Sequence, residues 1–155
     1  METLRLYRIS DKYIHFLKSR DSRVQDNKHR SRPYVGVVLH VGEFRYFVPM
    51  ESPKSNHANI GLLGFNNMIP VHDSALISFD INKEPDTKYA ELLKRQVTYI
   101  NRNKADVFNH ASQTYYNVVT KKNAFLLSIC CDFKKLECAC RQYDPNYLLK
   151  NKNRV

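Results

Sequence analysis

A hydroxyl, an ammonium group and an imidazole follow one another closely in the segment YFVPMESPKSNH, residues 46–57. Ser52 can donate a hydrogen bond to a phosphate oxygen, Lys54 carries a positive charge, and His57 titrates near neutral pH. Such groups can stabilise a developing negative charge and move a proton, as cleavage of a phosphodiester requires. The alternative is a solvated loop, because serine, proline and asparagine are ordinary turn residues.

The motifs of common catalytic classes are absent from the sequence. It contains no P-loop, no dinucleotide-binding glycine fingerprint, no H-E-x-x-H and no G-x-S-x-G. Its acidic residues do not cluster as a magnesium site needs. We therefore expect no metal and no cofactor, and metal-free cleavage is easier on RNA than on DNA, since RNA carries its own nucleophile, the 2′-hydroxyl. A bare Ser52 is a poor base, so its expected role is to anchor the phosphate or to relay a proton.

The charge balance favours a polyanionic partner, with nucleic acid ahead of an anionic membrane. The chain has 25 lysines and arginines against 15 aspartates and glutamates, a net charge of +10. No apolar run approaches the length of a membrane span, and the first residues do not resemble a signal peptide. We expect a soluble, cytoplasmic protein with no membrane partner. The alternative is a basic surface that only maintains solubility.

The four cysteines lie in one short stretch, at positions 130, 131, 138 and 140. Zinc sites usually take two separated C-x2–4-C pairs, which this spacing does not provide. A cytosolic location also disfavours disulfides. We expect the cysteines to be small buried apolar residues.

The first half of the chain reads as strands of an antiparallel sheet. Residues 4–9 alternate between apolar and polar, and Ser10 can cap a helix that follows. Residues 21–32 are expected to form a long, mobile, basic loop. Residues 34–41 and 44–48 predict a hairpin that ends at Pro49. Further strands are expected at 68–71, where a proline suits a sheet edge, and at 75–81.

The second half reads mainly as helices. A helix is expected to begin after Asp86, and a second one to be capped by Asp106. Residues 125–129 could form a strand or a short buried segment, and residues 132–143 a last helix before a basic tail. The prediction is one α+β domain over residues 1–155, an antiparallel sheet with surrounding helices.

Four stretches of the sequence resemble the ToxN/AbiQ family of type III toxin–antitoxin endoribonucleases. They are residues 5–24, 32–57, 66–71 and 88–103. The strand–turn–strand followed by P-x-x-S-P-K and a histidine is the most specific part.

The resemblance implies a compact twisted antiparallel sheet, nearly a barrel, similar to the MazF/Kid toxins. It implies metal-independent cleavage of cellular or phage RNA, leaving a 2′,3′-cyclic phosphate and a 5′-hydroxyl. It also implies a small pseudoknot RNA antitoxin that the toxin cuts from a precursor. Toxin and RNA then close into a multimer that covers the active site, and release of the toxin defends against phage by abortive infection.

By the same resemblance, the catalytic residues are Ser52, Lys54, Arg32 and His57. Tyr7 corresponds to a tyrosine on the first strand, which could stack on a base or belong to the core. Glu51 is a departure, since relatives commonly carry a small hydroxyl residue there, and a carboxylate beside a phosphate is repulsive unless it points away or is paired.

The expected RNA-binding residues share a positive charge or an aromatic ring and spread over the basic loop and the helices. They are Tyr7, Arg20, Arg23, Lys28, Arg30, Lys94, Arg95, Arg102, Lys121 and Lys122. The alternative function is a non-catalytic RNA-binding or scaffolding protein on the same fold. A DNA-binding regulator would need a recognisable helix-turn-helix, which the two long helices do not suggest.

Overall fold

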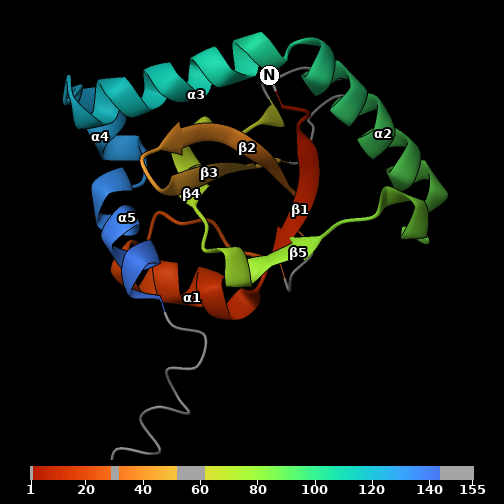
Figure 1. Ribbon diagram of the computed structural model, residues 1–155, viewed down its shortest axis with the longest axis horizontal. Helices are drawn as coiled ribbons and strands as arrows, with labels where there is room; N and C mark the ends of the chain where they lie inside the picture. Colours follow the sequence, from red (N-terminus) through yellow and green to blue (C-terminus); the bar gives the residue numbers. More distant parts are fainter. Residues whose placement is uncertain (1, 29–31, 52–61, 144–155) are drawn as a thin grey trace, which may run out of the picture.

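The described part of the chain is a curled antiparallel sheet with helices around it (Figure 1). The computed structural model describes residues 2–28, 32–51 and 62–143. The strands run in the order β4-β3-β2-β1-β5, and each neighbouring pair is antiparallel. They are β1 (Arg5–Ile9), β2 (Tyr34–Val41), β3 (Phe44–Pro49), β4 (Ile69–Pro70) and β5 (Leu76–Ser78). The predicted α+β class and twisted antiparallel partial barrel are confirmed.

The predicted hairpin is formed by β2 and β3, and an irregularity in β2 bends it. Gly42 turns the chain with a φ of 56°, a conformation that favours glycine. The pairing register shifts between Gly36 and Leu39, and such a bulge increases the local twist of a strand. A Cβ atom at Gly36 would lie 2.2 Å from Cδ2 of Phe47. Glycine at position 36 therefore lets the Phe47 ring lie directly against the β2 backbone.

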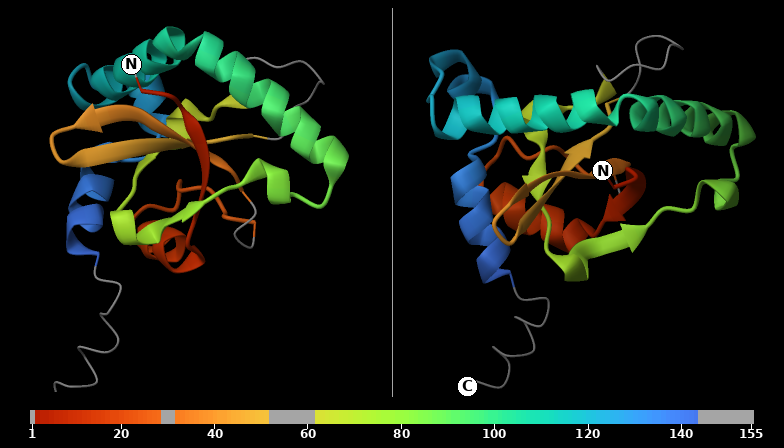
Figure 2. Two further views of the ribbon diagram at one scale, coloured as in Figure 1. Left: turned by 45° about the vertical axis from the view of Figure 1, so that its right-hand side comes forward. Right: turned by 45° about the horizontal axis from the view of Figure 1, so that its top comes forward.

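The helices cover the sheet on several sides (Figure 2). α2 and α3 form a bent arm, and α3 packs against β2. α1 packs against α5, which also contacts β4. The α-helices are α1 (Asp11–Arg20), α2 (Thr87–Arg102), α3 (Lys104–Val119), α4 (Ala124–Ile129) and α5 (Phe133–Gln142), and the 3-10 helices are η2 (Phe65–Asn67), η3 (Asp73–Ala75) and η4 (Ile81–Lys83).

Side-chain caps start three of the predicted helices, and the predicted cap at Ser10 is confirmed. Ser10, Asp86 and Asp132 each accept a hydrogen bond from the backbone N–H three residues on. The prediction that Asp106 caps the second long helix is wrong. Asn103 ends α2 and begins α3 at once, so Asp106 lies in the first turn of α3.

Residues 124–129 differ from the expectation of a strand or a buried segment. They form α4, in which Asn123 accepts a hydrogen bond from the Leu126 N–H and the Cys130 N–H donates to the Leu126 carbonyl. Phe125 is 69% exposed and Leu127 is 43% exposed. The cap and the short helical turn decide the conformation here, and tertiary burial does not.

Two further predictions are corrected in detail. β5 covers three residues rather than residues 75–81, because the Asp80 side chain accepts a hydrogen bond from the Asn82 N–H and starts η4. The basic segment before β2 differs from the expected mobile loop in its described part. Val24, Asn27 and Arg32 are buried there, and the Asn27 amide donates to the Ile9 carbonyl over 2.7 Å. The predicted edge position of the 68–71 segment is confirmed, since β4 is an outer strand.

Buried tyrosines join the layers of the core. The Tyr13 hydroxyl on α1 donates to the Pro70 carbonyl on β4 over 2.6 Å. Glu137 on α5 accepts from the Tyr46 and Tyr115 hydroxyls over 2.7 and 2.8 Å. Burial is the main cause that raises the pKa of Tyr13 and of Tyr46 above the ordinary tyrosine value. Both phenols therefore stay neutral and serve as donors. Within the described ranges, no helix has the length and apolar character to cross a membrane.

Candidate active site

Three of the four predicted catalytic residues lie on one segment whose two ends are held together. Ser52, Lys54 and His57 fall within residues 52–61, outside the described residues, and Arg30 lies outside them as well. The described residues on either side of this segment define the point of the sheet from which it starts and to which it returns.

Backbone pairing continues beyond the end of β3. The strand ends at Pro49 as predicted, but Met50 then forms an antiparallel bridge with Leu63. The Glu51 N–H donates to the Leu62 carbonyl over 2.7 Å. These contacts form a neck, residues 50–51 paired with 62–63, at the rim of the sheet. The neck fixes both ends of the segment that carries Ser52 and Lys54.

Arg32 is brought to this neck from the start of β2. It is 9% exposed, and its Nε donates to the Asp26 carbonyl over 2.7 Å while Nη1 donates to the Met50 carbonyl over 3.3 Å. The Met50 N–H also donates to the Pro33 carbonyl over 2.9 Å. The Arg32 guanidinium thus contacts Met50, the residue before Glu51. In the sequence, Arg32 and Ser52 are 20 positions apart. The fold therefore brings Arg32 to Met50, at the described end of the chain that leads to the Ser52 segment.

A cavity of about 460 Å³ opens beside the neck. One wall is the rim of the sheet, with Arg32, Met50 and Glu51. The opposite wall is the first half of α2, which presents one side of the helix. The full lining is Arg8, Lys28, Arg32, Pro33, Met50, Glu51, Glu84, Tyr89, Leu92, Leu93 and Gln96. Its size is within the roughly 300–1,000 Å³ of ligand-binding pockets.

Cations outnumber carboxylates around this cavity. Arg8, Lys28 and Arg32 face Glu51 and Glu84. Arg8 lies 3.8 Å from the Glu84 carboxylate, so the charges of these two residues largely cancel. The Arg8 guanidinium also lies over the Phe79 ring at 4.1 Å. Positive charge therefore prevails at the Arg32 side, next to the neck, where an anion would be stabilised.

Glu51 is held by neighbours on the far side of the neck. Its Oε1 accepts a hydrogen bond of 3.4 Å from the Gln25 amide, which also donates to Asn67 over 3.1 Å. A Cβ atom at Gly64 would lie 2.8 Å from the same oxygen. Because Gly64 has no side chain, there is room for the Glu51 carboxylate. Oε1 of Glu51 contacts the neutral amide of Gln25.

The chain matches known proteins along nearly its whole length. A family model described as "Toxin ToxN, type III toxin-antitoxin system" matches residues 5–60 and 55–141. An endoribonuclease ToxN from Bacillus thuringiensis subsp. kurstaki is 32% identical over 97% of this chain and 90% of its own length. This chain belongs to the ToxN family. The resemblance inferred from the four sequence stretches is confirmed.

Other members of the ToxN family agree in sequence and in structure. The endoribonuclease AbiQ from Lactococcus lactis subsp. lactis is 29% identical over 91% of this chain and 90% of its own length. A solved structure from a type III system, in which a non-coding RNA pseudoknot selectively inhibits the toxin, superposes with a TM-score of 0.81 at 32% identity, covering 92% of this chain and 98% of the other. The structure of AbiQ, an anti-phage endoribonuclease, gives 0.77 at 28% identity, with 97% and 99% covered.

Tyr7 lies apart from the Arg32 cavity in this ToxN family member. It is half-buried, and its ring meets the Phe47 ring edge-on at a centroid distance of 5.3 Å. Together with Lys94 it lines a second hollow, of about 490 Å³, between β1, β5 and α2. The ring is therefore anchored in the core on one side and borders this hollow on the other, and stacking of Tyr7 on a base stays a prediction.

Two of the predicted RNA-binding arginines have protein partners. Arg23 Nη1 donates to the Leu127 and Cys130 carbonyls over 2.7 and 2.5 Å, which fastens the turn after α1 to α4. Arg20 donates to the Gln142 side chain over 3.3 Å and lies 5.1 Å from the Phe16 ring. Both residues remain exposed, and each contributes to packing between segments distant in sequence.

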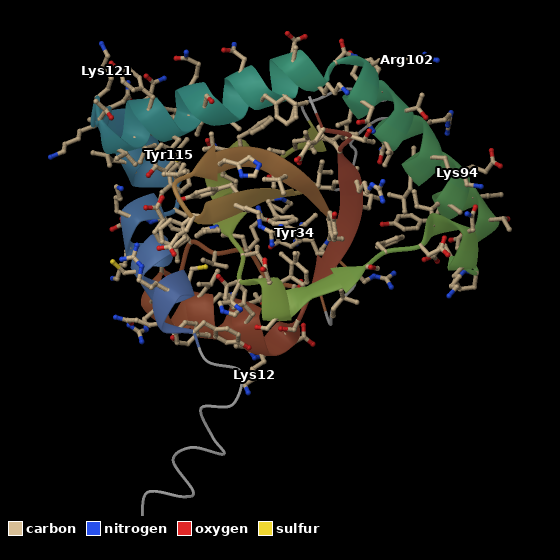
Figure 3. The ribbon with its side chains drawn as sticks, in the orientation of Figure 1. Lys12, Tyr34, Lys94, Arg102, Tyr115 and Lys121 are labelled. Atoms are coloured by element: carbon tan, nitrogen blue, oxygen red, sulfur yellow. The ribbon has the colours of Figure 1, made fainter. Side chains whose placement is uncertain are left out.

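The other predicted cations follow the α2–α3 arm. Lys94, Arg95 and Arg102 are exposed on α2, and Lys121 and Lys122 are exposed after α3. Figure 3 shows Lys94 and Arg102 along α2 and Lys121 at the opposite end of the arm. These predicted cations thus form two groups, one along α2 and one just after the end of α3, and together these groups are called the basic band. Of the predicted RNA-binding residues that the structure describes, Lys28 is the one that lines the Arg32 cavity.

The cysteines are mostly buried thiols, as predicted. Cys130, Cys131 and Cys140 are buried, while Cys138 is exposed. Burial raises the pKa of Cys130 to about 11 and that of Cys131 to about 12. Among the described residues, no three His, Cys, Asp or Glu side chains gather in a way that could hold a metal ion.

Sequence reasoning missed the α2 wall of the cavity. Tyr89, Leu92 and Leu93 read as core positions of an amphipathic helix, and Gln96, on the same side of the helix, is not among the predicted site residues. The available signal was Gln96 itself, a polar residue within an apolar stripe at helical spacing. Glu84 and Arg8 gave no local signal, because their pairing depends on the crossing of β1 with the segment before α2.

Proposed function

We propose that this chain is an endoribonuclease toxin that cuts RNA by attack of a 2′-hydroxyl on the adjacent phosphate, without a metal ion. The products are a 2′,3′-cyclic phosphate and a 5′-hydroxyl. The observation that carries the proposal is the position of Arg32, a buried cation held against the neck that starts the Ser52 segment. Its relatives ToxN and AbiQ are named endoribonucleases, which supports the class of reaction.

The described geometry supports a specific role for Arg32 in this reaction. Its Nε and Nη1 already donate to the carbonyls of Asp26 and Met50, which fixes the plane of the guanidinium. A guanidinium carries five N–H donors, so it can also donate to a phosphate oxygen. A donor that is fixed in advance stabilises the charge of the phosphorane with little reorganisation, and in many enzymes this kind of stabilisation accounts for most of the rate enhancement.

In the same proposal, the remaining roles fall to the segment between the two sides of the neck. Ser52 donates a hydrogen bond to the phosphate, and Lys54 supports the negative charge. His57 transfers a proton to or from the reacting oxygens, since it titrates near neutrality. The neck matters because it holds both ends of this segment next to Arg32.

We further propose that a small structured RNA inhibits the toxin. A pseudoknot RNA selectively inhibits the structural relative with a TM-score of 0.81. In this chain the RNA would lie on the basic band of α2 and α3, reach the Arg32 cavity, and be cut there from a longer precursor. RNA and toxin would then close into a multimer with the site covered, and release would act on cellular or phage RNA.

The test is to incubate the purified protein with end-labelled RNA, with and without EDTA, and to map the ends that are produced. Cyclic phosphate ends that form equally in EDTA are the expected result. A loss of cutting in EDTA would overturn the metal-free mechanism. Binding of RNA without any cutting would favour the alternative, a non-catalytic RNA scaffold.

The variant Ser52→Ala tests the assignment of the site. We expect cleavage to fall about 100- to 1,000-fold, as when one donor to a developing oxyanion is removed. Ser112→Ala is the matched control, because Ser112 is exposed on α3 and does not line the Arg32 cavity. A Ser52→Ala protein that cuts RNA as fast as the parent would show that the site lies elsewhere.

A further inference from the structure

Two of the hydrogen bonds that hold Arg32 end on one dipeptide, Asp26–Asn27. The Arg32 Nε donates to the Asp26 carbonyl over 2.7 Å, and the Arg32 backbone N–H donates to the Asn27 carbonyl over 3.3 Å. On the other side, Nη1 donates to the Met50 carbonyl in the neck over 3.3 Å. The direction in which the guanidinium points therefore depends on how firmly this dipeptide is held.

The Asn27 side chain fastens this dipeptide to the junction between β1 and α1. Its Nδ2 donates to the Ile9 carbonyl over 2.7 Å and to Asp11 Oδ1 over 2.7 Å. Ile9 is the last residue of β1 and is fully buried, and Asp11 is the first residue of α1. The amide thus connects the turn that carries the acceptors of Arg32 to two regular elements of the fold.

Burial distinguishes the Asn27 contacts from the other polar contact between this turn and α1. Asn27 is 4% exposed, and its Oδ1 is buried without a hydrogen-bond partner among the described residues. An unpaired buried oxygen is costly, so a residue that only filled space here would be apolar. The Lys18–Asp26 ion pair, at 3.0 Å, has an Asp26 side chain that is 80% exposed, and such pairs contribute little. The bonds that Asn27 donates are therefore the stronger link.

We propose that Asn27 is a positioning residue for the cleavage reaction, which acts through Arg32 and does not itself touch the RNA. By fixing the Asp26 carbonyl, the Asn27 amide keeps the guanidinium oriented before RNA binds. A donor that is oriented in advance needs little reorganisation as charge develops on the phosphate. This inference rests on the proposed function, in which Arg32 stabilises the charge of the phosphorane.

The orientation of Arg32 is measured without RNA, by nitrogen-15 NMR of its Nε–H group. The signal is identified by its loss in Arg32→Lys. We expect the Nε hydrogen to exchange with water at least ~10-fold faster in Asn27→Ala than in the parent, because the Asp26 carbonyl is no longer held as its acceptor. An unchanged exchange rate in a folded Asn27→Ala protein would overturn the proposal. A parent signal that already exchanges as fast as a free guanidinium would do so as well.

Asn101→Ala is the matched control. The Asn101 amide also holds backbone, just before β1, where its Oδ1 accepts from the Leu4 N–H over 2.8 Å and its Nδ2 donates to the Leu4 carbonyl over 3.0 Å. Asn101 does not line the Arg32 cavity, so its loss loosens β1 without releasing the Asp26 carbonyl. We expect exchange of the Arg32 Nε hydrogen to stay as in the parent. Equally fast exchange in both variants would show a general loosening of the fold and would overturn the proposal.

Cleavage kinetics separate positioning from a general structural role. We expect Asn27→Ala to lower kcat about 10- to 100-fold with little change in KM, because the chemical step loses an oriented donor while the contacts to RNA remain. The loss should nearly vanish in an Arg32→Lys background, since a residue that acts through Arg32 then has nothing to position. Asn101→Ala should have the same effect on kcat in both backgrounds. An equal loss from Asn27→Ala in both backgrounds would contradict action through Arg32.

The two proposals can fail separately. If the parent does not cut RNA but exchange at Arg32 depends on Asn27, the proposed function fails and the role of Asn27 in orienting Arg32 stands. If the parent cuts RNA and exchange at Arg32 is independent of Asn27, the positioning role fails alone. Asn27→Ser takes the place of the alanine variant, with the same expected results, should that variant not fold, because its single hydroxyl hydrogen cannot serve both acceptors.

Discussion

At the scale of single residues, Arg32 combines a structural and a chemical demand. Its guanidinium donates to two backbone carbonyls, at Asp26 and Met50, and in doing so lies against the neck. A lysine would keep the charge but could not reproduce the planar set of donors. The fixed orientation is therefore the property that the reaction would use.

We expect Arg32→Lys to lower cleavage at least ~100-fold and to reduce the free energy of unfolding by about 1–3 kcal/mol, because a buried carbonyl loses its partner. Cleavage rates and urea denaturation measure the two effects. Lys83→Arg, at an exposed position on η4, is the control. Full cleavage activity in Arg32→Lys would show that positive charge alone is sufficient.

The buried thiols predict a dependence of stability on alkaline pH. Burial, the largest cause, raises the pKa of Cys131 to about 12 from an unfolded value of about 8.5. The unfolded chain therefore loses the thiol proton first as the pH rises. The stabilisation is complete below about pH 8.5 and declines up to about pH 12, with a slope of about 1.4 kcal/mol per pH unit for one group.

Cys131→Ala is expected to reduce the slope by the contribution of one group, measured as the free energy of unfolding at several pH values, while the buried Cys130 keeps its own contribution. Cys138→Ala, at an exposed thiol, should keep the parent profile. Identical pH profiles for Cys131→Ala and the parent would contradict the assignment of the effect to this thiol.

At the scale of elements, the curvature of the β2–β3 hairpin depends on a bulge and a glycine. The Phe47 ring occupies the space that a Cβ atom at Gly36 would need, and the register of the hairpin shifts just beyond it. The same hairpin leads into the neck at its open end. A change in its curvature would therefore reach Arg32 and the Ser52 segment.

We expect Gly36→Ala to destabilise the fold by about 1–3 kcal/mol, since Phe47 must move to accommodate the methyl group. Gly42→Ala is the comparison, because no atom lies within 4 Å of a Cβ there and only its φ of 56° is unfavourable, at a cost of about 1 kcal/mol. Urea denaturation separates them. A smaller loss at Gly36 than at Gly42 would show that the Phe47 contact is easily relieved.

At the scale of the whole molecule, the net charge is +10, and the exposed cations of the basic band carry part of it. A partner that covers this band must be an extended polyanion. An RNA that reaches both the arm and the cavity would also cover the entrance to the proposed site.

We expect the affinity for a structured RNA to fall steeply with salt, with a slope of about −0.7 to −0.9 in log K against log salt for each phosphate contact. The double variant Lys121→Gln, Lys122→Gln should reduce this slope by about 1.5. Lys83→Gln, Lys135→Gln is the control pair outside the band. Affinity that hardly changes between low and high salt would count against a phosphate-based interface.

The elements of the fold were largely accessible from the sequence, because their signals are local. Ser10, Asp86 and Asp132 cap helices through side chains that reach only three residues along the chain. The hairpin of residues 34–49 follows from an apolar run and a glycine turn. Where two local signals competed, prediction failed, as at Asp106 and in residues 124–129.

The sequence by itself determined the family, the basic charge, and the presence of a hydroxyl, a lysine and a histidine on one segment. Only the tertiary structure decided that Arg32 meets the neck of that segment, and that Arg8 and Gln96 line the same cavity as Arg32. The physical reason is distance along the chain. Contacts between β1, β2 and α2 depend on how the sheet curls and how the helices pack, and no periodicity within one element encodes them.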